Sequence, residues 1–192
     1  MASDLLGLAI PATVAVAGFG VKYWNDLAIA RRKDQLERTN QQLRLAYGPL
    51  YALGRAQTEA WTAFRSLYRP QKHSYWKSEP PPTDADAVAW RLWMTEVFMP
   101  MNLRMERIVT ENADLFEEDT MADCLLALCA HVAAYKAVLK QWERGDYSTH
   151  VSVINFPQEE LRDYVESRYA RLKRRQVKLL TRLGKDSTQT SS

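Results

Sequence analysis

Cysteine and glycine are scarce in this chain, and their scarcity narrows the fold class. Only two cysteines occur among the 192 residues, Cys124 and Cys129. On one helix, at about 100° per residue, their spacing turns them roughly 140° apart, so they cannot form a disulfide with each other. The simplest setting is a reducing compartment. The presence of only seven glycines, together with stretches rich in Ala, Leu, Glu, Arg and Gln, favours helix over strand.

The sequence also lacks the short motifs that carry catalytic, nucleotide-binding or metal-binding chemistry. It contains no CxxC, HExxH, GxGxxG, P-loop or GxSxG pattern, and no Glu-x-x-His pair of the kind that builds a di-metal site in a helical bundle. Cys124 and His131 share one helix face but lie about 10 Å apart along the axis, too far for proton transfer. We therefore predict no catalytic residue, no metal and no cofactor, and we do not expect an enzyme.

Charge is absent from Leu5 to Val21, and this gap is the most informative feature of the chain. Seventeen uncharged residues at 1.5 Å per residue span about 25 Å, which approaches the roughly 30 Å hydrocarbon core of a bilayer. The segment crosses that core if the aromatic residues that follow it lie at the interface and the adjacent lysine extends to the headgroups. We predict a transmembrane anchor over residues 1–24, with these membrane-interface residues: Lys22, Tyr23, Trp24, Arg31, Arg32 and Lys33.

The distribution of basic residues predicts the orientation of this anchor. No Lys or Arg precedes Leu5, so a secretory signal peptide is not indicated. The basic residues that follow the apolar segment place its carboxyl-terminal side in the cytoplasm, with the N-terminus outside. An alternative stays open, because the segment contains Pro11 and few leucines. In that alternative it is the buried helix of a soluble helical protein.

Apolar periodicity predicts an all-α fold in which the anchor helix continues into a cytosolic antiparallel bundle of four to five helices. Gly48-Pro49 is expected to end the first helix. The bundle domain covers residues 25–184, with a Pro-rich loop at 70–83 that folds back through Tyr75 and Trp76, and a disordered tail over 185–192. The expected helices are 25–46, 50–68, one from Asp84 that Pro100 interrupts, 121–142, and one from 157 or 158 onward.

Two of these helices carry regular apolar stripes. The helix from Asp84 places apolar residues at steps of three and four: Trp90, Met94, Val97, Met101, Met105 and Ile108. The next helix has the strongest pattern in the chain, with alternating steps of four and three: Met121, Leu125, Leu128, Val132, Tyr135, Leu139 and Trp142. We expect the second of these helices to lie at the centre of the bundle.

The last helix is amphipathic, and its polar face is basic. Six residues form the predicted basic surface: Arg168, Arg171, Arg174, Arg175, Lys178 and Arg182. Such a face can bind anionic lipid or an acidic protein, or it can be solvated with its cations complementing the helix C-terminus. Nucleic acid is not an expected partner, because the net charge of the chain is only +3.

Several stretches resemble small bacterial membrane-anchored helical proteins that have no assigned activity. The resemblance rests on RRKDQLERTNQQLRLAYGPLYAL, which carries a Tyr-Gly-Pro-Leu turn after the apolar segment, and on HVAAYKAVLKQW and INFPQEELRDYVESRYARLK. It implies a bacterial origin and an anchored helical domain. It carries no catalytic residue to transfer to this sequence.

These observations predict a membrane-anchored helical scaffold or interaction module on the cytoplasmic face of a bacterial inner membrane. Its expected partners are membrane lipid and a protein, which can be a second copy of the same chain. One alternative is a membrane effector of the defence or toxin type, whose N-terminal helices oligomerise into a pore. An enzyme acting on lipid or nucleic acid is the least supported hypothesis.

Overall fold

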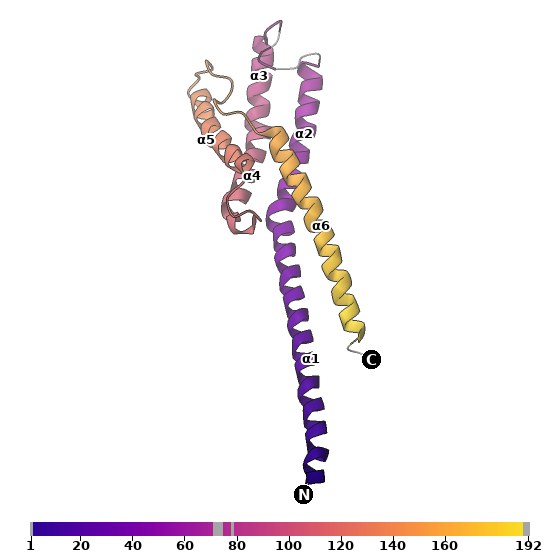
Figure 1. Cartoon of the computed structure of the whole chain (residues 1–192). Helices are drawn as coiled ribbons and strands as arrows, with labels where there is room; N and C mark the ends of the chain where they lie inside the picture. Colours follow the sequence, from indigo (N-terminus) through magenta and orange to yellow (C-terminus); the bar gives the residue numbers. More distant parts are fainter. Residues whose placement is uncertain (1, 71–74, 78, 190–192) are drawn as a thin grey trace. The chain divides into compact units, whose positions relative to one another are not determined.

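The computed structural model describes residues 2–70, 75–77 and 79–189, with side chains for 22–70, 75–77 and 79–186. Within these residues the chain is all-α and contains no strand. Four helical runs follow one another along the chain (Figure 1). The chain divides into two compact units: unit 1 comprises residues 1–40 and 173–192, and unit 2 comprises residues 41–172. The predicted all-α class is therefore confirmed for the described residues.

The first helical run does not end at Gly48-Pro49, so that prediction was wrong. It consists of α1 (Ala2–Gln41), the π-helical segment η1 (Gln42–Tyr47) and α2 (Gly48–Tyr68). Gly48 is itself helical, with φ −65° and ψ −53°, and its N–H bonds to the carbonyl oxygen of Leu43. A π turn accommodates an extra residue without breaking a helix. Pro49 then falls in the first turn of α2, where a proline is tolerated.

The second helical run also contains a π-helical segment just before a proline. It consists of α3 (Asp84–Trp93), the π-helical segment η2 (Met94–Phe98) and α4 (Met99–Glu111), with Pro100 in the first turn of α4. A reciprocal capping box starts the run: the Thr83 side chain accepts from the Asp86 N–H at 3.2 Å, and Asp86 accepts from the Thr83 N–H at 2.9 Å.

The π turn at η2 changes which side chains of this run are buried. The predicted stripe placed Val97 and Met101 in the core, but both are only half-buried. Phe98 and Asn102 are buried instead, with 3% and 1% exposure. Because a π turn takes up one extra residue, the inward face moves by one position after it. This shift places a polar residue, Asn102, in the interior.

The remaining elements follow the predicted pattern more closely. A short 3-10 turn η3 (Ala113–Leu115) precedes α5 (Asp123–Glu143), and α6 spans Gln158–Gln189. The predicted stripe of α5 is largely buried: Leu125, Leu128, Val132, Tyr135 and Trp142 are 7% exposed or less. Helix α4 packs against both α2 and α5. Gly145 follows α5 with a φ of 77°, a conformation that favours glycine.

The core of unit 2 is an aromatic cluster centred on Phe64, which is fully buried. Side chains from α2, the 70–83 loop, α3 and η2 contribute to it. Six rings have centroids 5.0–6.0 Å from that of Phe64: Trp61, Tyr68, Tyr75, Trp90, Trp93 and Phe98. Each such pair stabilises the fold by roughly 0.5–1.5 kcal/mol beyond its buried area.

The described part of the 70–83 loop folds back onto this cluster, as predicted. Tyr75 is 3% exposed, and its hydroxyl donates to the carbonyl oxygen of Asp86 at 2.7 Å. Burial raises the pKa of Tyr75 to about 12, so the hydroxyl stays protonated. Arg69, itself 7% exposed, donates to Asp86 at 3.1 Å and to the Pro80 carbonyl at 2.5 Å. These bonds attach the loop to the first turn of α3.

Unit 1 is a pair of helical segments, α1 up to Asn40 and the last part of α6 from Lys173 onward. Thr39 and Leu179 are buried within it, with 0% and 5% exposure. The Gln176 amide donates to Asn40 at 2.7 Å, and Arg32 forms an ion pair with Asp186. Polar contacts therefore join the two segments at both ends of the described pair.

Among the residues that the structure describes, no helix combines the length and apolar character needed to cross a bilayer. The predicted anchor, residues 1–24, lies outside the described side chains except for its last three residues. The predicted tail over 185–192 likewise lies mostly outside them, although the backbone of α6 extends to Gln189. Both stay predictions.

Substituting Gly48 with alanine should destabilise the protein, because a Cβ at this position would lie 2.2 Å from the Leu43 carbonyl oxygen. We expect a loss of about 1–3 kcal/mol in the free energy of unfolding, as for other overpacked sites. Gly54→Ala, on the same helix, is the matched control. A Cβ there meets no atom within 4 Å, so this change should be neutral or stabilise by up to about 1 kcal/mol. Urea denaturation of both variants tests the prediction, and equal effects would contradict it.

Candidate binding cavity

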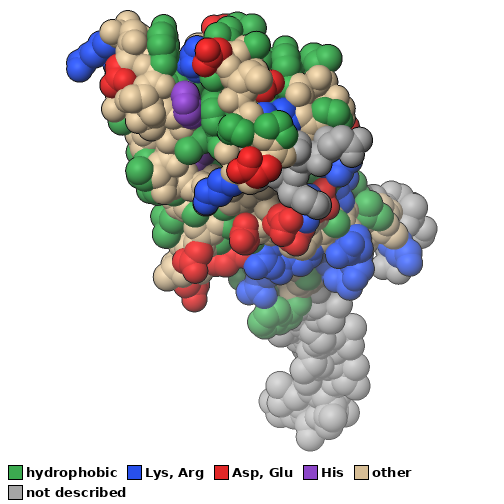
Figure 2. All heavy atoms as spheres, turned by 90° about the horizontal axis from the view of Figure 1, so that it is seen from above, with side chains coloured by type: hydrophobic (Ala, Val, Ile, Leu, Met, Phe, Trp, Pro, Cys, Tyr) green, Lys and Arg blue, Asp and Glu red, His purple; other side chains and the backbone are tan. Residues whose placement is uncertain are grey.

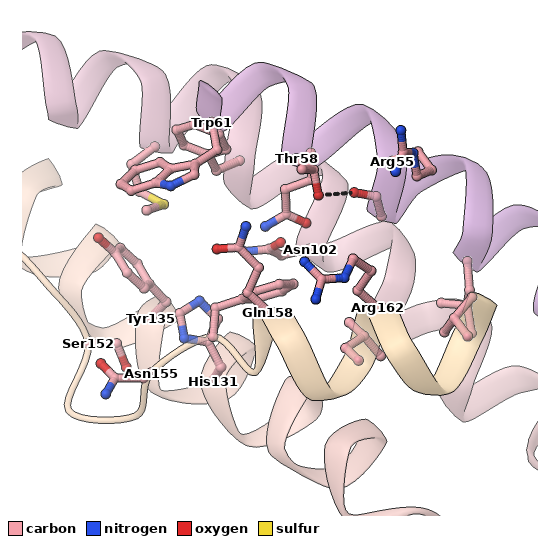
Figure 3. A pocket seen from close by; sticks show the side chains of 18 of the residues that line it. Arg55, Thr58, Trp61, Asn102, His131, Tyr135, Ser152, Asn155, Gln158 and Arg162 are labelled. Atoms are coloured by element: carbon pink, nitrogen blue, oxygen red, sulfur yellow. Dashed lines mark hydrogen bonds between the residues drawn. The ribbon is translucent and has the colours of Figure 1, made fainter. Parts of the chain in front are cut away.

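Unit 2 contains a cavity of about 290 Å³. Its walls come from α2, the α3–η2–α4 run, α5, the loop over 151–156 and the first turns of α6. Figure 3 shows Thr58 and Trp61 reaching it from α2, His131 and Tyr135 from α5, and Gln158 from α6. Elements far apart in sequence thus enclose one space.

Aromatic rings form one wall, and they belong to the Phe64 cluster. Trp61 lies edge-on to Trp90 with centroids 6.0 Å apart, and edge-on to Phe98 at 5.9 Å. All three rings line the cavity. Because the rings are held by packing on their other sides, this wall is largely preformed.

The loop wall is fixed by two hydrogen bonds to one backbone carbonyl. The oxygen of His150 accepts from Trp90 Nε1 at 2.8 Å and from the Tyr135 hydroxyl at 3.0 Å. Burial raises the pKa of Tyr135, so this phenol stays a donor. These bonds hold the start of the 151–156 loop against α3 and α5.

His131 contributes a neutral imidazole to the cavity wall. It is 5% exposed, and its Nδ1 lies 2.7 Å from the carbonyl oxygen of Ile154. Burial lowers the pKa of His131, which favours the neutral ring near pH 7. Since a carbonyl can only accept, Nδ1 carries the proton and Nε2 is an acceptor.

Asn102 places a buried amide among the residues that line the cavity. Its side chain is 1% exposed, and Nδ2 makes only a weak contact with Met99 Sδ at 3.9 Å. No donor among the described residues reaches its Oδ1, and the same is true of Gln57 Oε1. A buried acceptor without a partner costs roughly 1–3 kcal/mol. Polar groups of this kind in a cavity are typical of binding sites.

The charged residues at the cavity edge are paired with one another. Arg55 lies 3.6 Å from Glu166 and 3.7 Å from Glu59, and Arg162 donates to Asp163 at 3.0 Å. Each of these arginines therefore has a carboxylate next to it. The edge presents a balance of charges to an entering molecule.

The predicted membrane-interface residues lie on α1 in unit 1. Tyr23 and Trp24 are 65% and 66% exposed, with ring centroids 6.2 Å apart. Lys22, Arg31 and Lys33 are exposed as well. Arg32 differs, because it pairs with Asp186.

The six residues of the predicted basic surface fall into two groups. Arg168 pairs with Glu118 at 2.5 Å and Arg171 with Glu117, all in unit 2. Glu118 also accepts from the Tyr164 hydroxyl at 2.7 Å. The other four, Arg174, Arg175, Lys178 and Arg182, are exposed in unit 1. Figure 2 likewise shows acidic and basic side chains next to one another on the face that it draws.

The cavity itself was not anticipated from the sequence. Trp90 was predicted only as part of an apolar stripe and His131 was considered only for proton transfer, whereas Asn102 and Gln57 were not singled out. The available signal for Asn102 was Pro100, because a proline inside a helical pattern is a position where a π turn can shift the buried face. The described residues contain no group of three His, Cys, Asp or Glu side chains that could hold a metal ion.

Because His131 is buried, we predict that the protein loses stability on acidification. Its pKa is lowered by burial, so the unfolded state binds the proton more readily, and the stabilisation present above the reference pKa of 6.5 is lost as the pH falls below it. Between about pH 7.5 and pH 5 this single group changes the free energy of unfolding by at most about 2 kcal/mol. His131→Gln should flatten this dependence in urea titrations. Parallel curves for the wild-type protein and the variant would refute the assignment.

Comparison with protein-family models, curated proteins and solved structures finds no match to this chain. The function of the cavity and of the basic residues must therefore be inferred from their own chemistry.

Proposed function

We propose that the protein is a membrane-anchored helical interaction module. In this proposal residues 1–24 cross a bacterial inner membrane with the N-terminus outside, and the rest of the chain acts as a scaffold on the cytoplasmic face. Unit 1 contacts the lipid surface, and unit 2 binds the protein partner.

The observation that carries this proposal is the division of charge between the two units. Unit 1 contains eleven Lys or Arg and five Asp or Glu residues, whereas unit 2 contains fifteen and eighteen. Their formal charges are thus +6 and −3, although the whole chain carries only +3. Basic residues next to an anionic leaflet each contribute about 1 kcal/mol of attraction near the surface. The excess lies in the unit that includes the predicted anchor.

The exposed aromatic pair Tyr23 and Trp24 supports the same placement. Large aromatic side chains are seldom exposed side by side on a helix in water, but Tyr and Trp are enriched where a helix meets the headgroup region. Lys22 precedes this pair and Arg31 follows two helical turns later. The order of apolar segment, aromatic pair and basic residues is that of a membrane boundary.

Unit 2 offers an exposed apolar contact for a protein partner. Val88 and Leu92 lie one turn apart on α3 and are 57% and 58% exposed. Apolar side chains grouped on one helix face are typical of surfaces that a partner covers. This supports an interaction module over a purely structural anchor.

The anchor predicts that the full-length protein resists alkaline extraction from membranes. Val14→Arg together with Ala17→Arg should release it into the soluble fraction, because each central arginine costs about 2.5–3.5 kcal/mol on insertion. A matched control places the same two arginines at exposed helical positions of unit 2, as Ser66→Arg and Thr110→Arg. Immunoblotting of the two fractions measures the outcome. A wild-type protein that is fully soluble after extraction would remove the anchor from the proposal.

If unit 1 contacts anionic lipid, its lysines should be protected from chemical labelling when such lipid is present. With the full-length protein in vesicles, amine labelling of Lys33 and Lys178 should slow several-fold when phosphatidylglycerol replaces part of the phosphatidylcholine. Lys140, which is exposed in unit 2, is the internal control and should label equally in both vesicles. High salt should restore labelling because it screens the attraction. Mass spectrometry measures the labelling rate of each lysine. The lipid contact would be contradicted if each of the three lysines were labelled at the same rate in the two kinds of vesicle.

A further inference from the structure

We infer that the cavity in unit 2 is a binding site for a small, flat heteroaromatic molecule that carries N–H donors and no negative charge. The inference is independent of the membrane placement proposed above. It rests on the size of the cavity, on the unpartnered acceptors of two residues that line it and on the pairing of charges at its edge.

The volume and the aromatic wall set the size and shape of the ligand. An engineered cavity of about 150 Å³ holds one benzene molecule, so 290 Å³ accommodates about two fused rings. Trp61, Trp90 and Phe98 provide ring surfaces against which a flat molecule can stack or pack edge-on. A bicyclic heteroaromatic molecule fits both features.

Two of the residues that line the cavity have a buried acceptor without a partner, and an acceptor of this kind calls for a ligand that donates. Asn102 Oδ1 and Gln57 Oε1 are buried without a donor among the described residues. His131 adds Nε2, because its other nitrogen is bonded to Ile154. Figure 3 shows the side chains of Asn102 and Gln158 in the same part of the cavity. An N–H group that reaches Asn102 would relieve the cost of its unpaired oxygen.

Two other ligand classes fit less well. An anion would need a free cation, but Arg55 has Glu166 and Glu59 beside it and Arg162 has Asp163. An acyl chain would leave the amides of Asn102 and Gln57 buried against methylene groups, which raises the cost of their desolvation. A neutral or weakly basic donor avoids both penalties.

Gly54 offers a way to fill the cavity without disturbing the core. It lies in the cavity wall on α2, and a Cβ added there meets no atom within 4 Å. Leucine at this position should therefore occupy the ligand space. Alanine, which adds one methyl group, is the matched control.

The test measures binding of adenine, indole and benzothiophene to the full-length protein in detergent micelles by calorimetry and ligand-observed NMR. Adenine and indole carry N–H donors, whereas benzothiophene has the shape of indole without one. We expect the wild-type protein to bind indole about tenfold more tightly than benzothiophene, as for one buried hydrogen bond. Asn102→Leu should abolish that preference. Gly54→Leu should abolish binding of all three, and Gly54→Ala should retain it.

Gly54→Leu also gives the background from probes that dissolve in the micelle, and its thermal unfolding shows whether it is folded. The inference is overturned if the wild-type protein and folded Gly54→Leu bind the probes equally. It is also overturned if no probe binds at millimolar concentration, or if benzothiophene binds as tightly as indole. If Gly54→Leu does not fold, Asn102→Leu decides by the ratio of indole to benzothiophene affinity alone.

Discussion

The packing of aromatic rings around Phe64 is the interaction on which the rest of unit 2 depends. Phe64 is fully buried, and its neighbours come from α2, the 70–83 loop, α3 and η2. Trp61, Trp90 and Phe98 belong both to this cluster and to the cavity wall. Rings fixed on one side cannot turn to fill the space on the other, because protein interiors are close-packed and strongly resist repacking. The cavity therefore follows from the shape of the core.

Helix-period reasoning succeeds where the helix is regular and fails where a π turn shifts it. Helix α5 contains no proline, and five residues of its predicted stripe are buried: Leu125, Leu128, Val132, Tyr135 and Trp142. In the run before it, the same reasoning selected Val97 and Met101, whereas Phe98 and Asn102 are buried. A π turn before Pro100 moves the inward face by one residue. A pattern with a constant 3.6-residue period cannot predict this one-residue shift of the buried face.

The pairing of distant charges was also beyond sequence reasoning, because a helical projection contains only its own element. Arg168 and Arg171 project onto the predicted basic face of α6, but Glu118 and Glu117 neutralise them from a loop about fifty residues earlier in the sequence. The exposed basic residues that remain, from Arg174 onward, belong to unit 1, and the charge division becomes visible only once the units are known.

Helix α6 contributes to both proposals. Its first turns carry Gln158 and Arg162, which line the cavity, and its later turns carry Arg174, Arg175 and Lys178 in unit 1. A ligand in the cavity can influence the basic unit only if it binds two states of the protein with different affinity, and the coupling cannot exceed that difference. A tenfold difference in affinity corresponds to about 1.4 kcal/mol, similar to the attraction of one or two basic residues to an anionic surface. Any ligand control of the proposed lipid contact would therefore have to come from such a difference in affinity.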